Sequence, residues 1–152
     1  MYQDLKRNFP GVQKVHYTAA GCVDFMVFIS INRQSFPAEA RGVILAAMAS
    51  PKRPKFVVVL DDDIDIFDHV QVLWAISTRV RPADDVIIVP GYNTPALDPA
   101  YPQQEIGSAM GIDAARPFDK PFADTPAFRG MENIPDLLAM MHGLDNKSGD
   151  GK

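Results

Sequence analysis

Hydrophobic residues in the first part of the chain gather in short runs, and their spacing predicts the secondary structure. Apolar residues dominate 12–17, 24–31, 56–60 and 86–89, which we predict to be strands. The second and third runs are apolar without alternation, which is typical of strands covered on both faces. Strands of this kind belong to the interior of an α/β sheet.

Helical spacing separates these predicted strands. Ser35 is a candidate cap for an Ala-rich helix over 39–48. A second helix begins at Asp68, because Asp68 and Gln71 resemble a capping box. This helix is apolar all round at 72–76, so we expect the domain or another chain to cover more than one of its sides. The alternation predicts an α/β fold, a single three-layer domain with a largely parallel or mixed sheet.

The regular alternation stops after the fourth predicted strand. Seven prolines interrupt 90–130, which we predict to be a long Pro-rich loop that forms a lid or packs on something else. The glycines at the ends of 107–111 predict a backbone turn. A Met-rich C-terminal helix is predicted over 134–144, and the small polar residues of 145–152 predict a flexible tail. We therefore expect one α/β domain over 1–144, followed by the tail.

Composition limits the partners and the compartment. The chain has 152 residues, a formal net charge of −4 and a pI near 5.2, which argues against a nucleic-acid or membrane-surface partner. The single cysteine, Cys22, cannot form an internal disulfide, which favours a reduced cytoplasmic setting. We expect Cys22 to be a small buried thiol. The three histidines have no second His or Cys at ligand spacing, so no zinc site is expected.

An acidic cluster follows the third predicted strand. Its members are Asp61, Asp62, Asp63 and Asp65. Charges this close repel one another, so a cation, basic side chains or helix N-terminal amides must offset them. The favoured interpretation is a structural motif that is paired with basic side chains. The candidate partners are Arg79, Arg81 and Lys55. A divalent metal, or a role at an interface or ligand mouth, remains open, although the spacing is not that of an EF-hand loop.

A small basic cluster precedes the same strand. Lys52, Arg53 and Lys55 could hold a phosphate, or they could form a solvated turn. The sequence contains no P-loop, no Rossmann glycine fingerprint and no Gly-x-Ser-x-Gly motif. No set of residues makes a convincing acid–base pair or nucleophile, so the residues by themselves predict an α/β domain with a long functional loop.

The most distinctive motif is a buried strand, an acidic cluster and an apolar helix in direct succession. It reads Val-Val-Val-Leu-Asp-Asp-Asp-Ile-Asp-Ile and then Val-Leu-Trp-Ala-Ile-Ser-Thr-Arg-Val-Arg-Pro. Upstream stands Gly-Cys-Val-Asp-Phe-Met-Val-Phe-Ile-Ser-Ile, and downstream Gly-Ser-Ala-Met-Gly-Ile-Asp-Ala-Ala-Arg-Pro. In this order the motifs resemble the C-terminal domain of the UbiD-type decarboxylases, which are prenylated-FMN-dependent carboxy-lyases. The resemblance covers almost the whole chain.

The resemblance implies a component of a lyase that acts on aromatic or α,β-unsaturated acids. In the family this domain is the last part of a much longer chain, and the flavin-binding domain, the metal ligands and the catalytic Glu and Arg residues lie upstream. It follows from the resemblance that this chain holds no catalytic or metal-ligating residue and does not decarboxylate by itself. Prenylated FMN and a divalent metal are then held mainly by a larger flavin-binding partner chain.

Some roles carry over to single positions. Pro95 and Leu97 match a loop that reaches over the flavin and lines the substrate pocket in related enzymes. Lys52 is the nearest match to a lysine that contacts the cofactor phosphate, and Lys55 is the second choice. The segment 137–141 resembles one that packs on a neighbouring subunit, which implies a homo- or hetero-oligomer. Ala109 departs from the family, which often has Lys at this place.

Three hypotheses remain on these grounds. The first is a C-terminal domain or small subunit of a UbiD-type decarboxylase that closes the active site. The second is a non-catalytic assembly or regulatory protein with the same fold. The third is a metal-dependent nucleotide-sugar transferase, in which a strand followed by Asp-x-Asp holds a divalent ion and a diphosphate.

Overall fold

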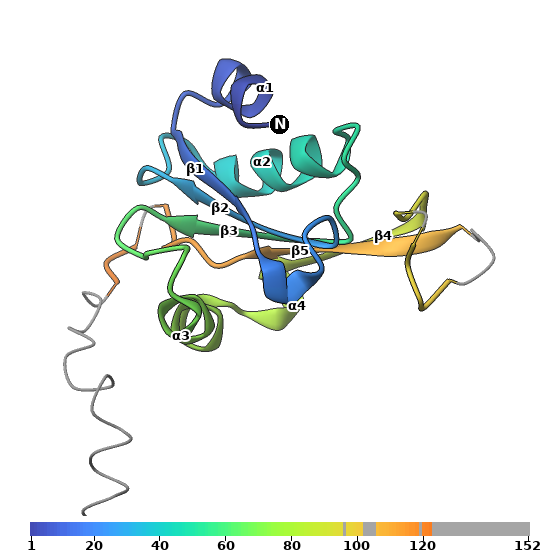
Figure 1. The fold of residues 1–152 in the computed structure, drawn as a ribbon. Helices are drawn as coiled ribbons and strands as arrows, with labels where there is room; N and C mark the ends of the chain where they lie inside the picture. The colour runs from blue at the N-terminus through green and yellow to red at the C-terminus, as the bar shows by residue number, and fades with distance from the viewer. Residues whose placement is uncertain (96, 102–105, 119, 123–152) are drawn as a thin grey trace, which may run out of the picture.

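Five strands form one sheet, which lies between helices on both of its faces (Figure 1). The computed structural model describes residues 1–95, 97–101, 106–118 and 120–122. The strands are ordered β1-β2-β3-β5-β4 in the sheet. Their bounds are Val12–Tyr17 for β1, Met26–Ile31 for β2, Phe56–Asp61 for β3, Val86–Tyr92 for β4 and Gly107–Asp113 for β5.

The three central strands are parallel, and the two outer strands run in the opposite direction. β2 pairs with β3 and β3 pairs with β5 in parallel, whereas β1 and β4 are each antiparallel to their neighbours. The sheet is therefore mixed, and the predicted α/β fold class is confirmed. The carboxyl ends of β2, β3 and β5 lie at one edge of the sheet and their amino ends at the other, so the domain has two distinct ends.

Helices cover the sheet on both sides. α1 (Tyr2–Asn8) and α2 (Glu39–Met48) lie on one face, and α3 (His69–Arg79) lies on the other (Figure 1). The short helix α4 (Pro82–Asp85) leads from α3 into β4, and the 3-10 turn η1 (Ala19–Gly21) joins β1 to β2. Within the described residues, none of the helices has both the length and the apolar character needed to cross a lipid bilayer. The predicted helix over 134–144 and the predicted tail over 145–152 lie outside the described residues.

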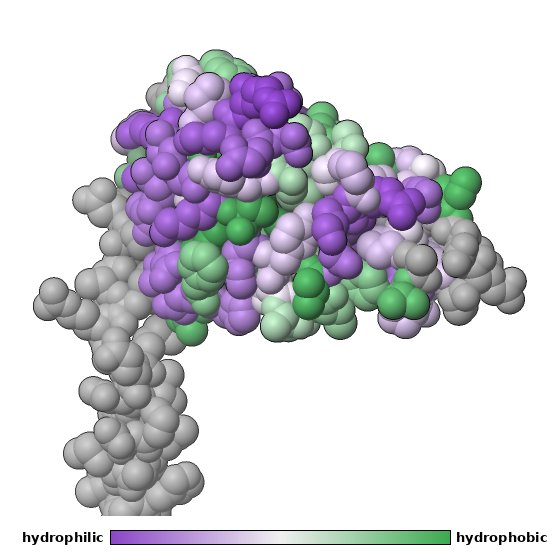
Figure 2. Space-filling view, turned by 45° about the horizontal axis from the view of Figure 1, so that its top comes forward, coloured by the Kyte–Doolittle hydropathy of each residue, from purple (hydrophilic) through white to green (hydrophobic). Residues whose placement is uncertain are grey.

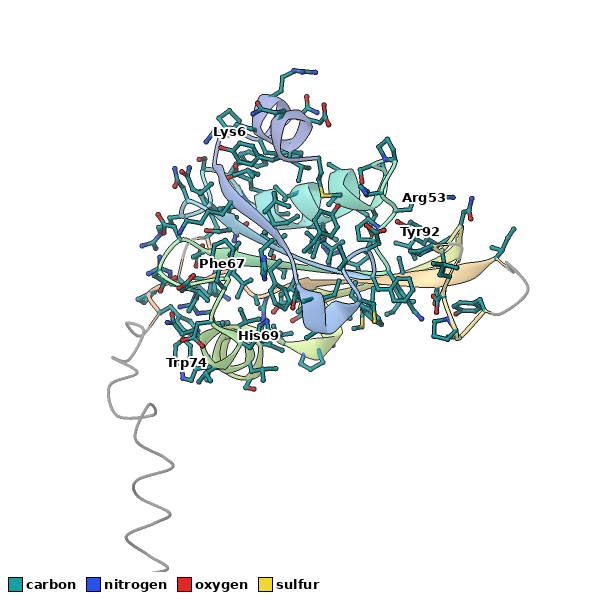
Figure 3. All side chains as sticks on the ribbon, in the orientation of Figure 1. Lys6, Arg53, Phe67, His69, Trp74 and Tyr92 are labelled. Carbon is teal, nitrogen blue, oxygen red and sulfur yellow. The ribbon has the colours of Figure 1, made fainter. Side chains whose placement is uncertain are left out.

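Two hydrophobic clusters fill the spaces between the sheet and its helices (Figure 3). Successive residues of β3 point to opposite faces, so Val57 and Val59 join the cluster under α2, and Val58 and Leu60 join the cluster over α3. This burial on both faces explains why the sequence of β3 is apolar without alternation.

β5 is the main difference from the sequence prediction. The turn predicted at 107–111 is wrong, because these residues form most of a strand in the interior of the sheet. A Cβ on Gly111 would lie 2.2 Å from Cγ2 of Ile44, so the glycine lets α2 pack closely against β5. A strand built of Gly, Ser, Ala and Met offers no run of large apolar residues, and the hydrophobic pattern therefore missed it.

The helix caps were predicted with mixed success. The Asp68 cap of α3 is confirmed, since its carboxylate accepts a hydrogen bond from the Val70 amide at 2.9 Å. The Ser35 cap of α2 is wrong: the helix begins after Ala38, and the Ser35 amide instead donates to the Glu39 carboxylate.

The prediction that Cys22 is a buried thiol is also wrong, because Cys22 is exposed in a left-handed turn after η1.

Candidate functional site

The acidic cluster lies at the carboxyl end of β3, where it meets two arginines. Arg79, from the last turn of α3, donates to Asp63 at 2.7 Å and lies 3.4 Å from Asp61. Arg116, which follows β5, donates to the same Asp61 oxygen from its backbone amide at 2.7 Å and from its side chain at 3.0 Å. The side chains of Asp61 and Arg79 have no exposed surface. The network therefore ties β3, α3 and the segment after β5 together.

The other two aspartates of the cluster have different surroundings. Asp65 accepts a hydrogen bond from the Phe67 amide at 3.1 Å, which supports the loop into α3, and Asp62 is exposed. Of the three candidate partners only Arg79 meets the cluster in this structure, because Arg81 pairs with Asp85. Among the described residues no group of three His, Cys, Asp or Glu side chains could hold a metal ion.

Burial and basic neighbours act in opposite directions on the Asp61 carboxyl. Burial raises the pKa of Asp61 above its ordinary value, while the hydrogen bonds and the charges of Arg116 and Arg79 lower it. Burial has the larger effect, so the pKa of Asp61 is raised overall. The arginines are therefore needed to keep a carboxylate at this place, and the cluster ties β3, α3 and the segment after β5 together.

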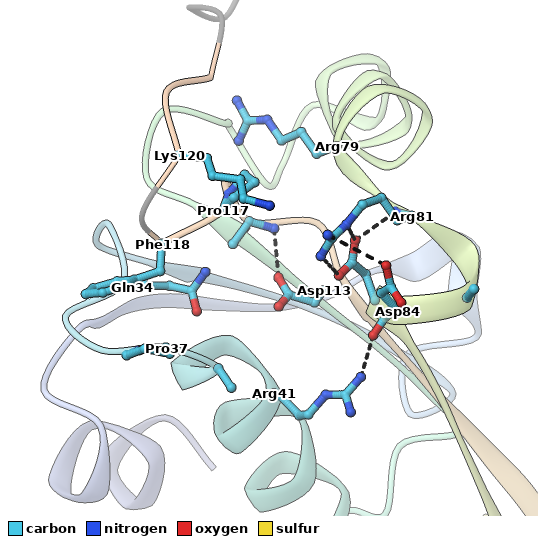
Figure 4. A pocket seen from close by; sticks show the side chains of 14 residues that line it. Gln34, Pro37, Arg41, Arg79, Arg81, Asp84, Asp113, Pro117, Phe118 and Lys120 are labelled. Atoms are coloured by element: carbon cyan, nitrogen blue, oxygen red, sulfur yellow. Dashed lines mark hydrogen bonds and ion pairs between the residues drawn. The ribbon is translucent and has the colours of Figure 1, made fainter.

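A polar cavity of about 570 Å³ lies beside the cluster, at the carboxyl end of β5 (Figure 4). Arg41 reaches it from α2 and donates to the Asp84 carbonyl oxygen, while Arg81 is held by Asp85 at 2.7 Å. Asp113 lies between these two sides of the cavity, and its carboxylate accepts a hydrogen bond from the Ala115 amide at 3.1 Å. No sequence pattern predicted this cavity, because its wall combines α2, α4 and the segment after β5.

Asp113 is the most strongly perturbed carboxyl of the cavity. Burial raises its pKa from 3.8 to about 6, the charges of Asp85 and Asp61 add to the increase, and the hydrogen bond from Ala115 opposes it. Between about pH 4 and pH 6 the folded chain thus keeps a proton that the unfolded chain has lost. The free energy of unfolding consequently falls as the pH rises through this window.

We expect the variant Asp113→Asn to be more stable than the wild type at pH 7.5, by about 1–3 kcal/mol, and to lose most of this advantage at pH 4. Asparagine keeps the acceptor for the Ala115 amide but has no charge to bury. Urea unfolding at the two pH values measures the difference. Asp62→Asn, at an exposed position, is the control and should change little at either pH. An equal gain for Asp113→Asn at both pH values would contradict the assignment.

The opposite end of the sheet carries the residues predicted to face substrate and cofactor. Lys52 and Lys55 precede the amino end of β3, and the loop with Pro95 and Leu97 follows β4. Lys55 is paired with Asp98 in this loop, with Nζ 2.9 Å from the carboxylate. The structure therefore brings the loop and Lys55 together.

Leu97 is the most exposed large hydrophobic residue of the described chain, with 88% of its surface accessible. Pro95 is half-buried next to it. Ile106, which directly precedes β5 on the other side of the loop, is 74% exposed. Hydrophobic surface is visible at this end of the molecule (Figure 2). Exposed apolar residues on both sides of one loop are typical of a surface that another protein or a ligand covers.

Lys52 lies in the turn that leads to β3. Its side chain is 61% exposed, and Nζ lies 3.4 Å from the carboxylate of Asp24, whose side chain is 50% exposed. An ion pair of this kind contributes little to stability and dissociates easily. Lys52 therefore keeps an ammonium group that can turn to another partner, whereas Lys55 does not.

A protein-family model described as the 3-octaprenyl-4-hydroxybenzoate carboxy-lyase C-terminal domain matches residues 1–114. The chain belongs to the UbiD family of decarboxylases. Anhydromevalonate phosphate decarboxylase of Methanothermobacter thermautotrophicus is 38% identical over 117 residues, which are 77% of this chain and 27% of that protein. The chain thus spans little more than a quarter of the length of this relative.

Solved structures of UbiD-class enzymes share the fold. HmfF from Pelotomaculum thermopropionicum, in complex with FMN, superposes with a TM-score of 0.76 at 34% identity, over 87% of this chain and 30% of that chain. Vanillic acid decarboxylase of Sedimentibacter hydroxybenzoicus, in its closed form, has a TM-score of 0.72 at 28% identity, over 93% of this chain and 31% of that chain. The same enzyme in its open form matches with a TM-score of 0.71 at 27% identity, over 96% of this chain and 32% of that chain.

Sequence reasoning missed three residues that organise the two ends of this UbiD domain. Asp98 and Tyr101 lie in the Pro-rich segment, and Arg116 follows a strand that was not predicted. The hydrophobic pattern contains no signal for any of them. An Asp-Pro pair in a loop is ordinary turn chemistry, and only the paired lysine from a distant segment shows that Asp98 is special.

Proposed function

We propose that this chain is the part of a UbiD-type decarboxylase that closes over a flavin bound by a larger partner polypeptide and shapes the pocket for the acid substrate. The related structures support the cofactor side of this proposal, since HmfF was solved with FMN and, in an evolved dimeric form, with prFMN. Open and closed forms of vanillic acid decarboxylase support a closing movement. Closure excludes water and completes a site that neither part forms alone.

The observation that carries the proposal is Leu97, which is 88% exposed on a loop that the Lys55–Asp98 ion pair anchors. A leucine that is 88% exposed adds almost no buried apolar surface to the stability of the isolated domain, yet Asp98 next to it is buried and paired. A rigid loop with an apolar tip can cover an apolar substrate at little entropic cost, because its order is already established before binding. In the proposal Pro95 and Leu97 face the substrate.

Aromatic and α,β-unsaturated carboxylic acids are the substrate class that fits such a tip. Their rings and double bonds are flat and apolar, so contact with Leu97 removes apolar surface from water, while the carboxylate must be bound elsewhere. The basic and acid–base groups that handle this carboxylate belong, in the proposal, to the partner.

The partner also holds most of the cofactor. Prenylated FMN, when bound together with a divalent metal, provides the electron sink that makes loss of carbon dioxide possible. Of this chain's residues, the exposed Lys52 fits one cofactor group, the anionic phosphate, because its ammonium is accessible and only weakly paired. The described residues offer no cluster that fits the metal.

Mixing experiments test the proposal. The chain alone should release no carbon dioxide from a panel of aromatic and unsaturated acids, and a larger flavin-binding UbiD polypeptide purified from the same host should gain activity when the chain is added. In the reconstituted complex, Leu97→Trp and Pro95→Trp should change the preference among acids of different size. Turnover by the chain alone would reject the proposal. Unchanged substrate choice and rate in both variants would favour a non-catalytic assembly role instead.

The third hypothesis, a nucleotide-sugar transferase, gains no support from the site. Asp61 and Asp63 would have to provide ligands for a divalent ion, but both carboxylates are engaged by Arg79. No observation favours it over the decarboxylase.

A further inference from the structure

The loop after β4 is organised around one buried carboxylate. Asp98 is 3% exposed, its amide donates to the Pro95 carbonyl at 3.0 Å, and its carbonyl accepts from the Tyr101 amide at 3.0 Å. Its side chain accepts a further bond from the Ala100 amide at 3.0 Å. Two consecutive turns therefore share Asp98, and Leu97 lies in the first of them.

Lys55 supplies the charge that this carboxylate requires. The ammonium of Lys55 lies 2.9 and 3.0 Å from the two Asp98 oxygens, and the side chains are only 17% and 1% exposed. The same ammonium lies 5.3 Å from the centre of the Tyr101 ring, which is within the range of a cation–π contact. A buried carboxylate that loses its paired cation carries a large desolvation penalty.

The anchor is also tied to the sheet. The Lys55 carbonyl accepts a hydrogen bond from the Met110 amide of β5 at 2.8 Å, so its backbone is fixed between two strands. The loop folds back onto the first residue of β5, where a Cβ on Gly107 would lie 2.5 Å from the Tyr101 ring and 2.9 Å from the Thr94 methyl group. Lys55 thus links β3, β5 and the loop that carries Leu97.

We propose that Lys55 is a positioning residue, whose ion pair with Asp98 fixes the loop that presents Leu97, and that it is not a ligand of the flavin phosphate. The inference rests on the proposed function for its consequence in catalysis, but the anchoring of the loop stands independently of it. The two lysines before β3 then have different roles: the Lys52 ammonium remains available to bind an anion, and Lys55 holds the loop.

Hydrogen–deuterium exchange on the full chain tests the anchoring first. Lys55→Met should make the amides of Ala100 and Tyr101 exchange at least tenfold faster, and Asp98→Asn should do the same for Tyr101 while sparing the rest of the sheet. Lys55→Arg, which keeps the charge, should recover most of the protection. Lys52→Met is the matched control, because it removes the exposed neighbouring lysine, and should change the loop amides by less than twofold. Circular dichroism of each variant confirms that the fold is retained. If Lys55→Met does not fold, Asp98→Asn decides the question.

Two measurements on the complex with the larger flavin-binding chain test the consequence. Lys55→Met should raise KM for the acid or lower kcat/KM about tenfold while leaving the affinity for FMN within twofold, whereas Lys52→Met should weaken FMN binding. In the Lys55→Met background a further Leu97→Ala change should have almost no effect, because the loop no longer presents the leucine. This lack of additivity would not arise from two independent defects.

Opposite results overturn the inference. Unchanged exchange of Ala100 and Tyr101 in Lys55→Met would show that the ion pair does not hold the loop. A loss of FMN affinity in Lys55→Met, with Lys52→Met unaffected, would assign the phosphate to Lys55. If the loop loosens as expected but Leu97→Ala has no effect on turnover in the otherwise wild-type complex, the anchoring stands and the proposed function fails.

Discussion

Arg79→Met is expected to lower the free energy of unfolding by about 3–5 kcal/mol, which is a large share of the stability of a domain of this size. The Arg79 side chain has no exposed surface, and it pairs with Asp63 at 2.7 Å and with the equally buried Asp61 at 3.4 Å. Methionine fills the space but leaves Asp61 with less compensation for its burial. Urea unfolding measures the loss, and the melting temperature should fall by roughly 10 °C.

Lys52→Met is the control for this experiment, since it breaks an ion pair whose partners are 61% and 50% exposed. Its effect should remain within about 0.5 kcal/mol. Arg79→Met combined with Asp61→Asn should be less destabilised than the sum of the single variants, because the second change removes the uncompensated carboxylate. A loss below about 1 kcal/mol for Arg79→Met would mean that Arg116 alone satisfies the cluster.

Leu97→Asp is expected to reduce kcat/KM of the reconstituted decarboxylase about 10- to 100-fold, which corresponds to about 1.4–2.7 kcal/mol of transition-state stabilisation. In the proposed function Leu97 covers the apolar part of an acid substrate. Aspartate at this position would bring a negative charge near the substrate's own carboxylate and repel it. Stability should hardly change, because the residue is 88% exposed. Steady-state kinetics of carbon dioxide release and a thermal melt of the same preparation measure both.

Ile88→Asp is the matched control, since it places the same charge on β4 at a residue that is 58% exposed and lies outside the loop. Its kinetics should stay within about twofold of the wild type, and its stability should change no more than that of a typical surface variant. Equal losses of activity for both variants would point to a general charge effect on assembly with the partner rather than to contact between Leu97 and the substrate.

Sequence patterns determined the elements whose apolar residues have a clear period. β2 and β3 were predicted because burial on both faces requires continuous apolar runs, and α3 because Asp68 caps it. The motif around these elements also indicated the family, which the match over residues 1–114 confirms. In each case the pattern that allowed the prediction involves residues that are close together in the chain.

Tertiary structure decided the rest, because the interactions concerned join residues far apart in sequence. β5 is a strand through its neighbours β3 and β4, and Gly111 is required there by the approach of Ile44. Three basic residues were equal candidates for the acidic cluster, and only the position of α3 selects Arg79. Likewise Lys55 and Asp98 are 43 residues apart, and nothing in either neighbourhood shows that a buried ion pair joins them. Local patterns therefore fixed the layers of this domain, whereas its charge pairs, and with them the anchor of the Leu97 loop, depend on how those layers assemble.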